Sequence, residues 1–194
     1  MTAKLKIGMP AGSLADPNRG GNLINLLTNS GFSVSGYAQG GPTKFTSVNF
    51  LFGWDGRPQE FGSQLEINEI DVAIAGDDWI KERILEMKLE YGSEVNLERV
   101  LALNRGGVKL VGIVDGNEFD TVEDFLKDLC SRKKLLTVVS EMPYLTLDWL
   151  RTKLKAIGML DKFQSFSVQK YKSPSKIKSG IVIYETWGDR KSVV

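Results

Sequence analysis

The segment Ile70-Asp-Val-Ala-Ile-Ala75 leads through Gly76-Asp-Asp78 into a Glu- and Lys-rich stretch that reaches Tyr91, and it decides the fold class. The compact apolar run predicts a buried strand, and the amphipathic stretch predicts a helix that begins near Asp78. Strands that alternate with such helices are typical of α/β proteins with parallel sheets. The segment therefore predicts one unit of an α/β fold.

The rest of the chain repeats this order of strand and helix. Further strands are expected at 4–9, 32–37, 45–52, 108–114, 135–139, 163–171 and 180–184. Further helices are expected at about 23–29, 59–68, 121–132 and 146–157. The repetition predicts a mostly parallel sheet flanked by helices in each half of the chain.

Composition excludes several classes of site. The 194 residues include 25 Lys and Arg against 24 Asp and Glu, so the net charge is +1 and capture of nucleic acid or of an acidic membrane is not the expected main activity. Histidine is absent, which excludes a Ser-His-Asp triad, a Cys-His pair and a His-ligated metal. The single cysteine, Cys130, excludes an internal disulfide and a cysteine zinc cluster.

No apolar run is long enough for a signal peptide or a membrane span. A lone thiol without an export signal is typical of a reducing compartment, so we expect a cytoplasmic protein without nucleic-acid or membrane partners. The sequence leaves open whether the chain forms a homo-oligomer.

The exits of four predicted buried strands supply the candidate binding residues. In open α/β sheets, ligands bind at the carboxyl ends of the strands, where glycine lets a ligand approach backbone amides and helix N-termini favour anions. The residues at these exits are Gly12, Ser13, Gly76, Asp78, Ser140, Glu141, Glu185, Thr186 and Gly188. Each alone is explained as an ordinary turn or cap residue; together they predict one cavity for a phosphorylated or carboxylated small molecule.

Two arginines are the candidate cations for such a ligand, namely Arg57 and Arg190. The glycine-rich dinucleotide fingerprint and the P-loop motif are both absent. Four carboxylates could ligate magnesium through oxygen: Asp71, Asp77, Asp78 and Glu185. Because Asp77 and Asp78 would serve equally as caps of the following helix, the residues themselves assign no metal site.

The strand exits resemble those of the ATP phosphoribosyltransferases, which catalyse the first step of histidine biosynthesis. Residues 5–14 are similar to that family's first strand and its Pro-Lys-Gly-Arg-Leu turn. Residues 57–61 and 70–79 resemble the Arg-Pro-x-Asp-Ile-Pro segment and the Ala-Asp-x-Gly-Ile-Thr-Gly-x-Asp block. Residues 137–146 look like the family's Val-Ala-Thr-Glu-Tyr-Pro-x-Leu-Thr.

The resemblance implies two α/β lobes, like those of a type II periplasmic binding protein. Lobe I would comprise 1–105 plus 180–194 and lobe II would comprise 106–179, with chain crossings near 100–108 and 172–181. It also implies a nucleotide-binding glycosyltransferase that uses magnesium. Its substrates would be phosphoribosyl pyrophosphate and ATP, with the phosphoribosyl group passing to N1 of ATP.

The sequence departs from the family in ways that open two alternatives. Ala11 and Ser13 stand where the family carries Lys and Arg; Trp187 is inserted in the loop after the last strand, and Val182 replaces an acid. The chain stops at Val194, so we expect a truncated or degenerate relative that is weak or inactive as a transferase. The alternatives are a non-catalytic two-lobed protein that binds a small anionic ligand, and an α/β protein kept for interaction alone.

Overall fold

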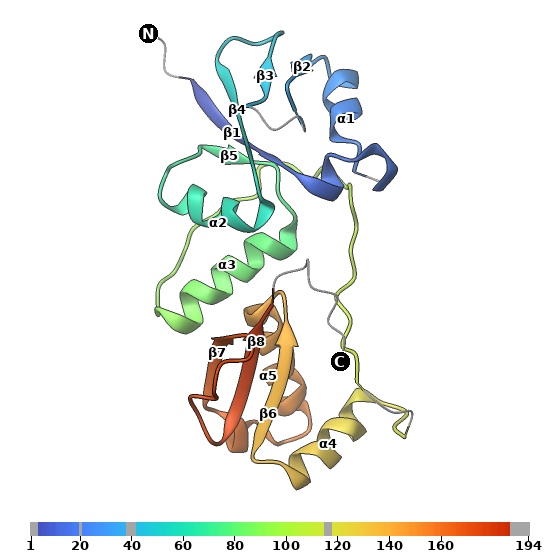
Figure 1. Ribbon diagram of the computed structural model, residues 1–194, viewed down its shortest axis with the longest axis vertical. Coiled ribbons are helices and arrows are strands. Elements are labelled where there is room, and N and C mark those ends of the chain that lie inside the picture. Colours follow the sequence, from blue (N-terminus) through green and yellow to red (C-terminus); the bar gives the residue numbers. More distant parts are fainter. Residues whose placement is uncertain (1–3, 20, 38–41, 115–117, 187–194) are drawn as a thin grey trace. The chain divides into compact units, whose positions relative to one another are not determined.

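The computed structural model describes residues 4–19, 21–37, 42–114 and 118–186. The chain divides into two compact units, Met1–Leu110 and Val111–Val194 (Figure 1). None of the described helices is long and apolar enough to cross a membrane.

A parallel sheet of three strands forms the centre of the first unit. Strand β1 (Leu5–Pro10) lies between β4 (Leu51–Gly56) and β5 (Val72–Ala73). Pro10 is in register with Gly56, and Gly8 is in register with Ala73. The carboxyl ends of the three strands therefore lie at the same edge of the sheet.

Helices α2 (Pro58–Glu66) and α3 (Asp77–Glu90) follow β4 and β5. Phe61 of α2 is fully buried against the sheet, and two glycines make room for it. A Cβ at Gly56 would lie 2.9 Å from Phe61 Cε1, and one at Gly8 would lie 3.3 Å from Phe61 Cδ1. Glycine at these two positions thus allows α2 to pack closely on the strands.

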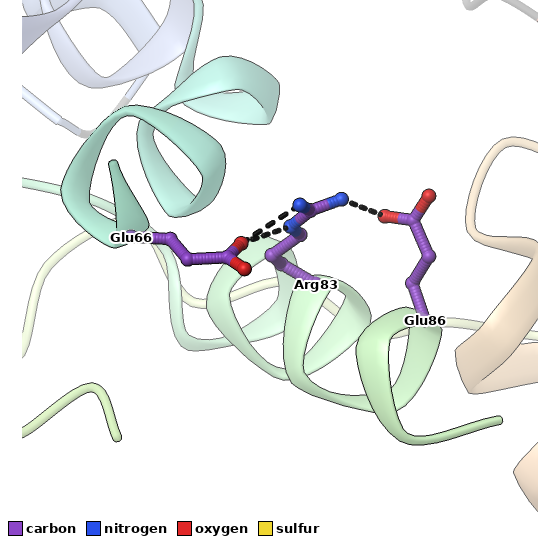
Figure 2. Close-up of polar contacts among 3 residues, drawn as sticks. All are labelled: Glu66, Arg83 and Glu86. Carbon is purple, nitrogen blue, oxygen red and sulfur yellow. Dashed lines mark hydrogen bonds and ion pairs between the residues drawn. The ribbon is translucent and has the colours of Figure 1, made fainter. Parts of the chain in front are cut away.

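An ion-pair cluster joins α2 to α3 (Figure 2). The Arg83 guanidinium lies 2.7 Å from Glu66 Oε2 through Nη2 and 2.8 Å from Glu86 Oε2 through Nη1. Burial lowers the pKa of Arg83, but the hydrogen bonds to Glu86 and Glu66 outweigh it and the pKa is raised. The cluster therefore fixes the two helices through a permanently charged guanidinium.

The first unit has a second layer made of α1 (Leu23–Asn29) and a two-stranded antiparallel ribbon. The ribbon strands are β2 (Val34–Ser35) and β3 (Lys44–Phe45), and the short 3-10 helices η1 (Gly12–Leu14) and η2 (Pro17–Arg19) connect β1 to α1. This layer buries one apolar cluster, which consists of Met9, Ala15, Leu23, Tyr37 and Phe45.

The second unit contains another parallel sheet. Strand β8 (Gly180–Glu185) lies between β6 (Leu135–Ser140) and β7 (Phe166–Lys170), and Ile181, Val182 and Ile183 are fully buried because β8 is central. The other elements of this unit are α4 (Val122–Arg132), α5 (Pro143–Ala156) and η3 (Leu160–Phe163). The predicted α/β class, with parallel sheets flanked by helices, is confirmed in both units.

The division of the chain differs from the one that the sequence predicted. The last strand was expected in lobe I, but β8 pairs with β6 and β7 of the second unit, and the boundary falls after Leu110 rather than at 105. The segment 172–181, expected as a crossing, connects β7 to β8 within that unit. The backbone groups of a buried central strand must be hydrogen-bonded along both of its edges, and for β8 the neighbouring strands β6 and β7 provide these bonds. The periplasmic-binding-protein-like arrangement of lobes stays a prediction.

The strand predicted at 108–114 is wrong. These residues form no helix or strand, and Val111 and Ile113 are 74% and 89% exposed. An apolar run becomes a strand only when a neighbouring strand satisfies its backbone groups, and no described strand pairs with this one.

Candidate functional site

The carboxyl edge of the first sheet brings together strand exits from three parts of the sequence. Gly12 follows β1 by two residues, Arg57 follows β4 directly, and Gly76 follows β5 by three residues. The Ala11 N–H donates to the Gly56 carbonyl oxygen at 2.9 Å, which holds the first two exits side by side. Predicted site residues from 12 to 78 therefore lie at one edge.

The turn after β1 requires glycine for its backbone conformation. Gly12 has a φ of +84°, and no atom lies within 4 Å of the position where a Cβ would stand. Positive φ is strained for other residues, so conformation rather than space selects glycine here. Ser13 follows within η1. Because neither Ala11 nor Ser13 has a charged side chain, this exit offers a ligand backbone amides rather than a cation.

Arg57 is the cation that the sequence predicted for this edge. It precedes Pro58, the first residue of α2, and its side chain is exposed. Within the described part of the chain, Arg57 forms no ion pair. Its guanidinium is therefore available for an anionic ligand at the edge of the sheet.

Asp77 and Asp78 are engaged within their own surroundings. Asp78 Oδ1 accepts a hydrogen bond from the Trp79 N–H at 2.9 Å, and it would lie 2.2 Å from a Cβ at Gly76. Asp77 forms an ion pair with Arg99. These contacts favour the interpretation of both carboxylates as residues of the helix start.

Sequence reasoning missed a polar cluster on β4 beside this edge. Asp55 Oδ1 accepts hydrogen bonds from the Thr43 N–H at 3.1 Å and from Thr43 Oγ1 at 2.5 Å. Tyr37 Oη donates to the Pro10 carbonyl oxygen at 2.5 Å, and burial, together with the charge of Asp55, raises the pKa of Tyr37. The strand predicted at 45–52 ended before Asp55; the position of Asp55 between Gly53 and Gly56, shortly before Arg57, was the signal available.

The second sheet has a comparable edge. Ser140 is in register with Glu185, and the Thr186 N–H donates to the Ser140 carbonyl oxygen at 3.0 Å. The Ser140 hydroxyl accepts from the Met142 N–H at 3.0 Å, which fixes the turn into α5. Exposed Glu141 lies in that turn, so four predicted residues meet at this edge.

Gly188 and Arg190 lie outside the described residues. The two edges belong to different units, so the prediction that all the candidate residues face one cavity stays a prediction.

The described carboxylates do not fit a protein-held magnesium ion. Among the described residues, no group of three or more Asp, Glu or Cys side chains could hold a metal. Asp71 lies at the opposite edge from Asp78, where it accepts from the Lys6 N–H at 2.7 Å. Magnesium commonly binds in proteins through substrate phosphates together with one or two carboxylates.

A groove of about 350 Å³ lies at the amino ends of β1 and β4. Its lining includes Lys4, Lys44, Asn49 and Phe52, none of which is a predicted site residue. Thr43, the hydrogen-bond partner of Asp55, also lines this groove, but none of the predicted site residues does.

Comparison with known proteins gives one partial similarity. Over 90 residues, the chain is 34% identical to ATP phosphoribosyltransferase of Geotalea daltonii (strain DSM 22248 / JCM 15807 / FRC-32). The chain resembles this enzyme over part of its length. The match spans 42% of the chain but only 26% of that enzyme, and no protein-family profile matches the chain.

Proposed function

We propose that the chain binds phosphoribosyl pyrophosphate and ATP and transfers the phosphoribosyl group to ATP. The observation that carries the proposal is the 34% identity to an ATP phosphoribosyltransferase. The carboxyl edges of the two sheets support it, because they gather glycine turns, helix starts and the exposed Arg57 where an anionic substrate can approach.

The reaction is a displacement at the anomeric carbon. N1 of ATP forms a bond to that carbon, while the bond to the diphosphate oxygen breaks and its electron pair leaves with pyrophosphate. A protein accelerates this step by holding two anionic substrates in line and by stabilising the charge on the leaving group. Neither task requires histidine, which this chain lacks.

Each edge has a role in this proposal. The turn at Gly12 and Ser13, the helix start at Gly76 and Asp78, and the cation Arg57 contact phosphate groups at the first edge. At the second edge, Ser140, Glu141, Glu185 and Thr186 offer hydroxyl and carboxylate groups to a substrate.

A specific observation favours a second candidate function, the binding of the same ligands without turnover. The exit of β1 offers Ala11 and Ser13, so it provides no charged group to stabilise a leaving diphosphate. Loss of a fixed charge stabiliser typically lowers a rate by a factor of about 100 to 1,000. A chain of this kind would bind the substrates without measurable turnover.

Calorimetry and a product assay test the proposal together. The chain is titrated with phosphoribosyl pyrophosphate and with ATP, with and without magnesium, and the formation of phosphoribosyl-ATP is followed spectrophotometrically. Saturable heat with both compounds is the expected result, and the absence of heat with either overturns the proposal. Product at about 1 per second or faster assigns an ordinary transferase, whereas binding without product assigns the second candidate.

A further inference from the structure

Asp55 occupies a distinctive place at the carboxyl edge of the first sheet. It is the penultimate residue of β4, in register with Met9 of β1, and Arg57 follows it by two positions. Its side chain is half-buried. A carboxylate at this depth loses part of its hydration, so its oxygens need hydrogen-bond donors.

Thr43 supplies donors to only one of the two oxygens. The Thr43 N–H and hydroxyl both donate to Asp55 Oδ1, at 3.1 and 2.5 Å, and Thr43 itself is fully buried. Gly53 allows this approach, because a Cβ there would lie 2.4 Å from Thr43 Cβ. Among the residues that the structure describes, none donates a hydrogen bond to Oδ2. The carboxylate is therefore held in one orientation, in which Oδ2 can accept a hydrogen bond from a further donor.

The charge of Asp55 indicates which part of a ligand it would recognise. An ionised carboxylate only accepts hydrogen bonds and repels phosphate, so its partner is a hydroxyl or amino group. Arg57, at the end of the same strand, has the opposite preference. A ligand that carries both a phosphate and sugar hydroxyls matches this pairing of charges.

We propose that Asp55, oriented by Thr43, accepts a hydrogen bond from a sugar hydroxyl of a phosphorylated ribose and so distinguishes it from a simple phosphate. The inference rests on the proposed function and names a residue that selects the substrate. The hydroxyl belongs either to the phosphoribosyl donor or to the ribose of ATP, which share this chemistry.

The test measures the affinities of the wild-type chain and Asp55→Asn for ribose 5-phosphate, ATP and pyrophosphate by calorimetry. The asparagine keeps an oxygen for Thr43 but loses the charge, and a hydrogen bond to a charged acceptor is stronger than a neutral one. Roughly tenfold weaker binding of at least one ribose compound is expected, with pyrophosphate unchanged or tighter. A loss confined to ribose 5-phosphate assigns the donor sugar, and a loss confined to ATP assigns the nucleotide.

Two further variants make the result specific. Asp71→Asn makes the same charge change at the opposite edge of the sheet, where Asp71 accepts from the Lys6 N–H, and it should leave all three affinities unchanged. Thr43→Val removes the hydroxyl that orients Asp55, and it should weaken ribose binding without affecting pyrophosphate; it decides the matter if Asp55→Asn does not fold.

Each remaining outcome is decisive. Equal losses for ribose compounds and pyrophosphate, or no loss in a folded variant, overturn the role of Asp55 while leaving the proposed function in place. Binding of pyrophosphate but of neither ribose compound by the wild-type chain also overturns it. Absence of binding to every probe overturns the proposed function as well.

Discussion

Replacing Gly53 by alanine should destabilise the first unit by about 3 kcal/mol. A Cβ at this position would lie 2.4 Å from Thr43 Cβ and 2.6 Å from the Thr43 carbonyl oxygen, and a backbone oxygen cannot rotate away. The segment at Thr43 must therefore shift, which strains its hydrogen bonds to Asp55 and the 3.0 Å bond from the Gly53 N–H. The three hydrogen bonds contribute about 1 kcal/mol each and overpacking costs about 1–3 kcal/mol, so the loss of one or two of these bonds with moderate overpacking gives about 3 kcal/mol.

The measurement is urea unfolding followed by circular dichroism, with hydrogen exchange of 5–10 and 51–56 to assign the loss to the first unit. Gly107→Ala is the matched control, because no atom lies within 4 Å of its Cβ position, and it should change the free energy of unfolding by less than about 0.5 kcal/mol. A loss below about 1 kcal/mol for Gly53→Ala would show that Thr43 is not packed against β4 as described.

Three further variants test other parts of the structure. Arg57→Ala should weaken pyrophosphate binding about 10- to 150-fold in calorimetry, because a charge-assisted contact is lost, and an unchanged affinity would remove Arg57 from the site. Burial raises the pKa of Tyr37 in the folded chain above its value in the unfolded chain. Below about pH 10 the phenol is neutral in both states; above this pH the unfolded chain ionises first, so the free energy of unfolding falls as the pH rises. Tyr37→Phe should therefore show a smaller fall in the free energy of unfolding between pH 8 and 11, measured by urea unfolding. At neutral pH it should cost about 1 kcal/mol, because the Pro10 carbonyl loses its donor. The same slope of unfolding free energy against pH in variant and wild type would contradict the burial of this phenol. Arg83→Met should cost about 1–2 kcal/mol in urea unfolding, since Glu66 and Glu86 lose their partner, and a variant as stable as the wild type would show that the cluster is replaceable by apolar packing.

Compact apolar runs were sufficient to predict most strands of the parallel sheets. The runs at 4–9, 135–139 and 180–184 become β1, β6 and β8 with shifts of one residue at most at each end. The sequence could not say which sheet receives a central strand, because β8 is apolar on both faces and would suit either unit. Backbone pairing decides this, and pairing is not encoded in the strand's own pattern.

The candidate site was predictable where it depends on the ends of strands. Register alone brings Ser140 beside Glu185 and the exit of β1 beside that of β4. Asp55 was not predictable in this way, because Gly53 interrupts the apolar run although β4 continues to Gly56. The orientation of the Asp55 side chain depends on Thr43. Because Thr43 precedes a different strand, β3, the sequence pattern alone does not show that the two residues are in contact.

Mapping of amide chemical shifts by NMR on addition of phosphoribosyl pyrophosphate tests the central claim most directly. The claim predicts that the largest shifts fall at the carboxyl edges of the sheets, on residues 11–13, 55–57, 76–78 and 140–142. Residues at the amino ends, such as Leu5 and Leu135, should shift little. Shifts concentrated at those amino ends, or no shifts at saturating ligand, would contradict the claim that the strand exits bind this substrate.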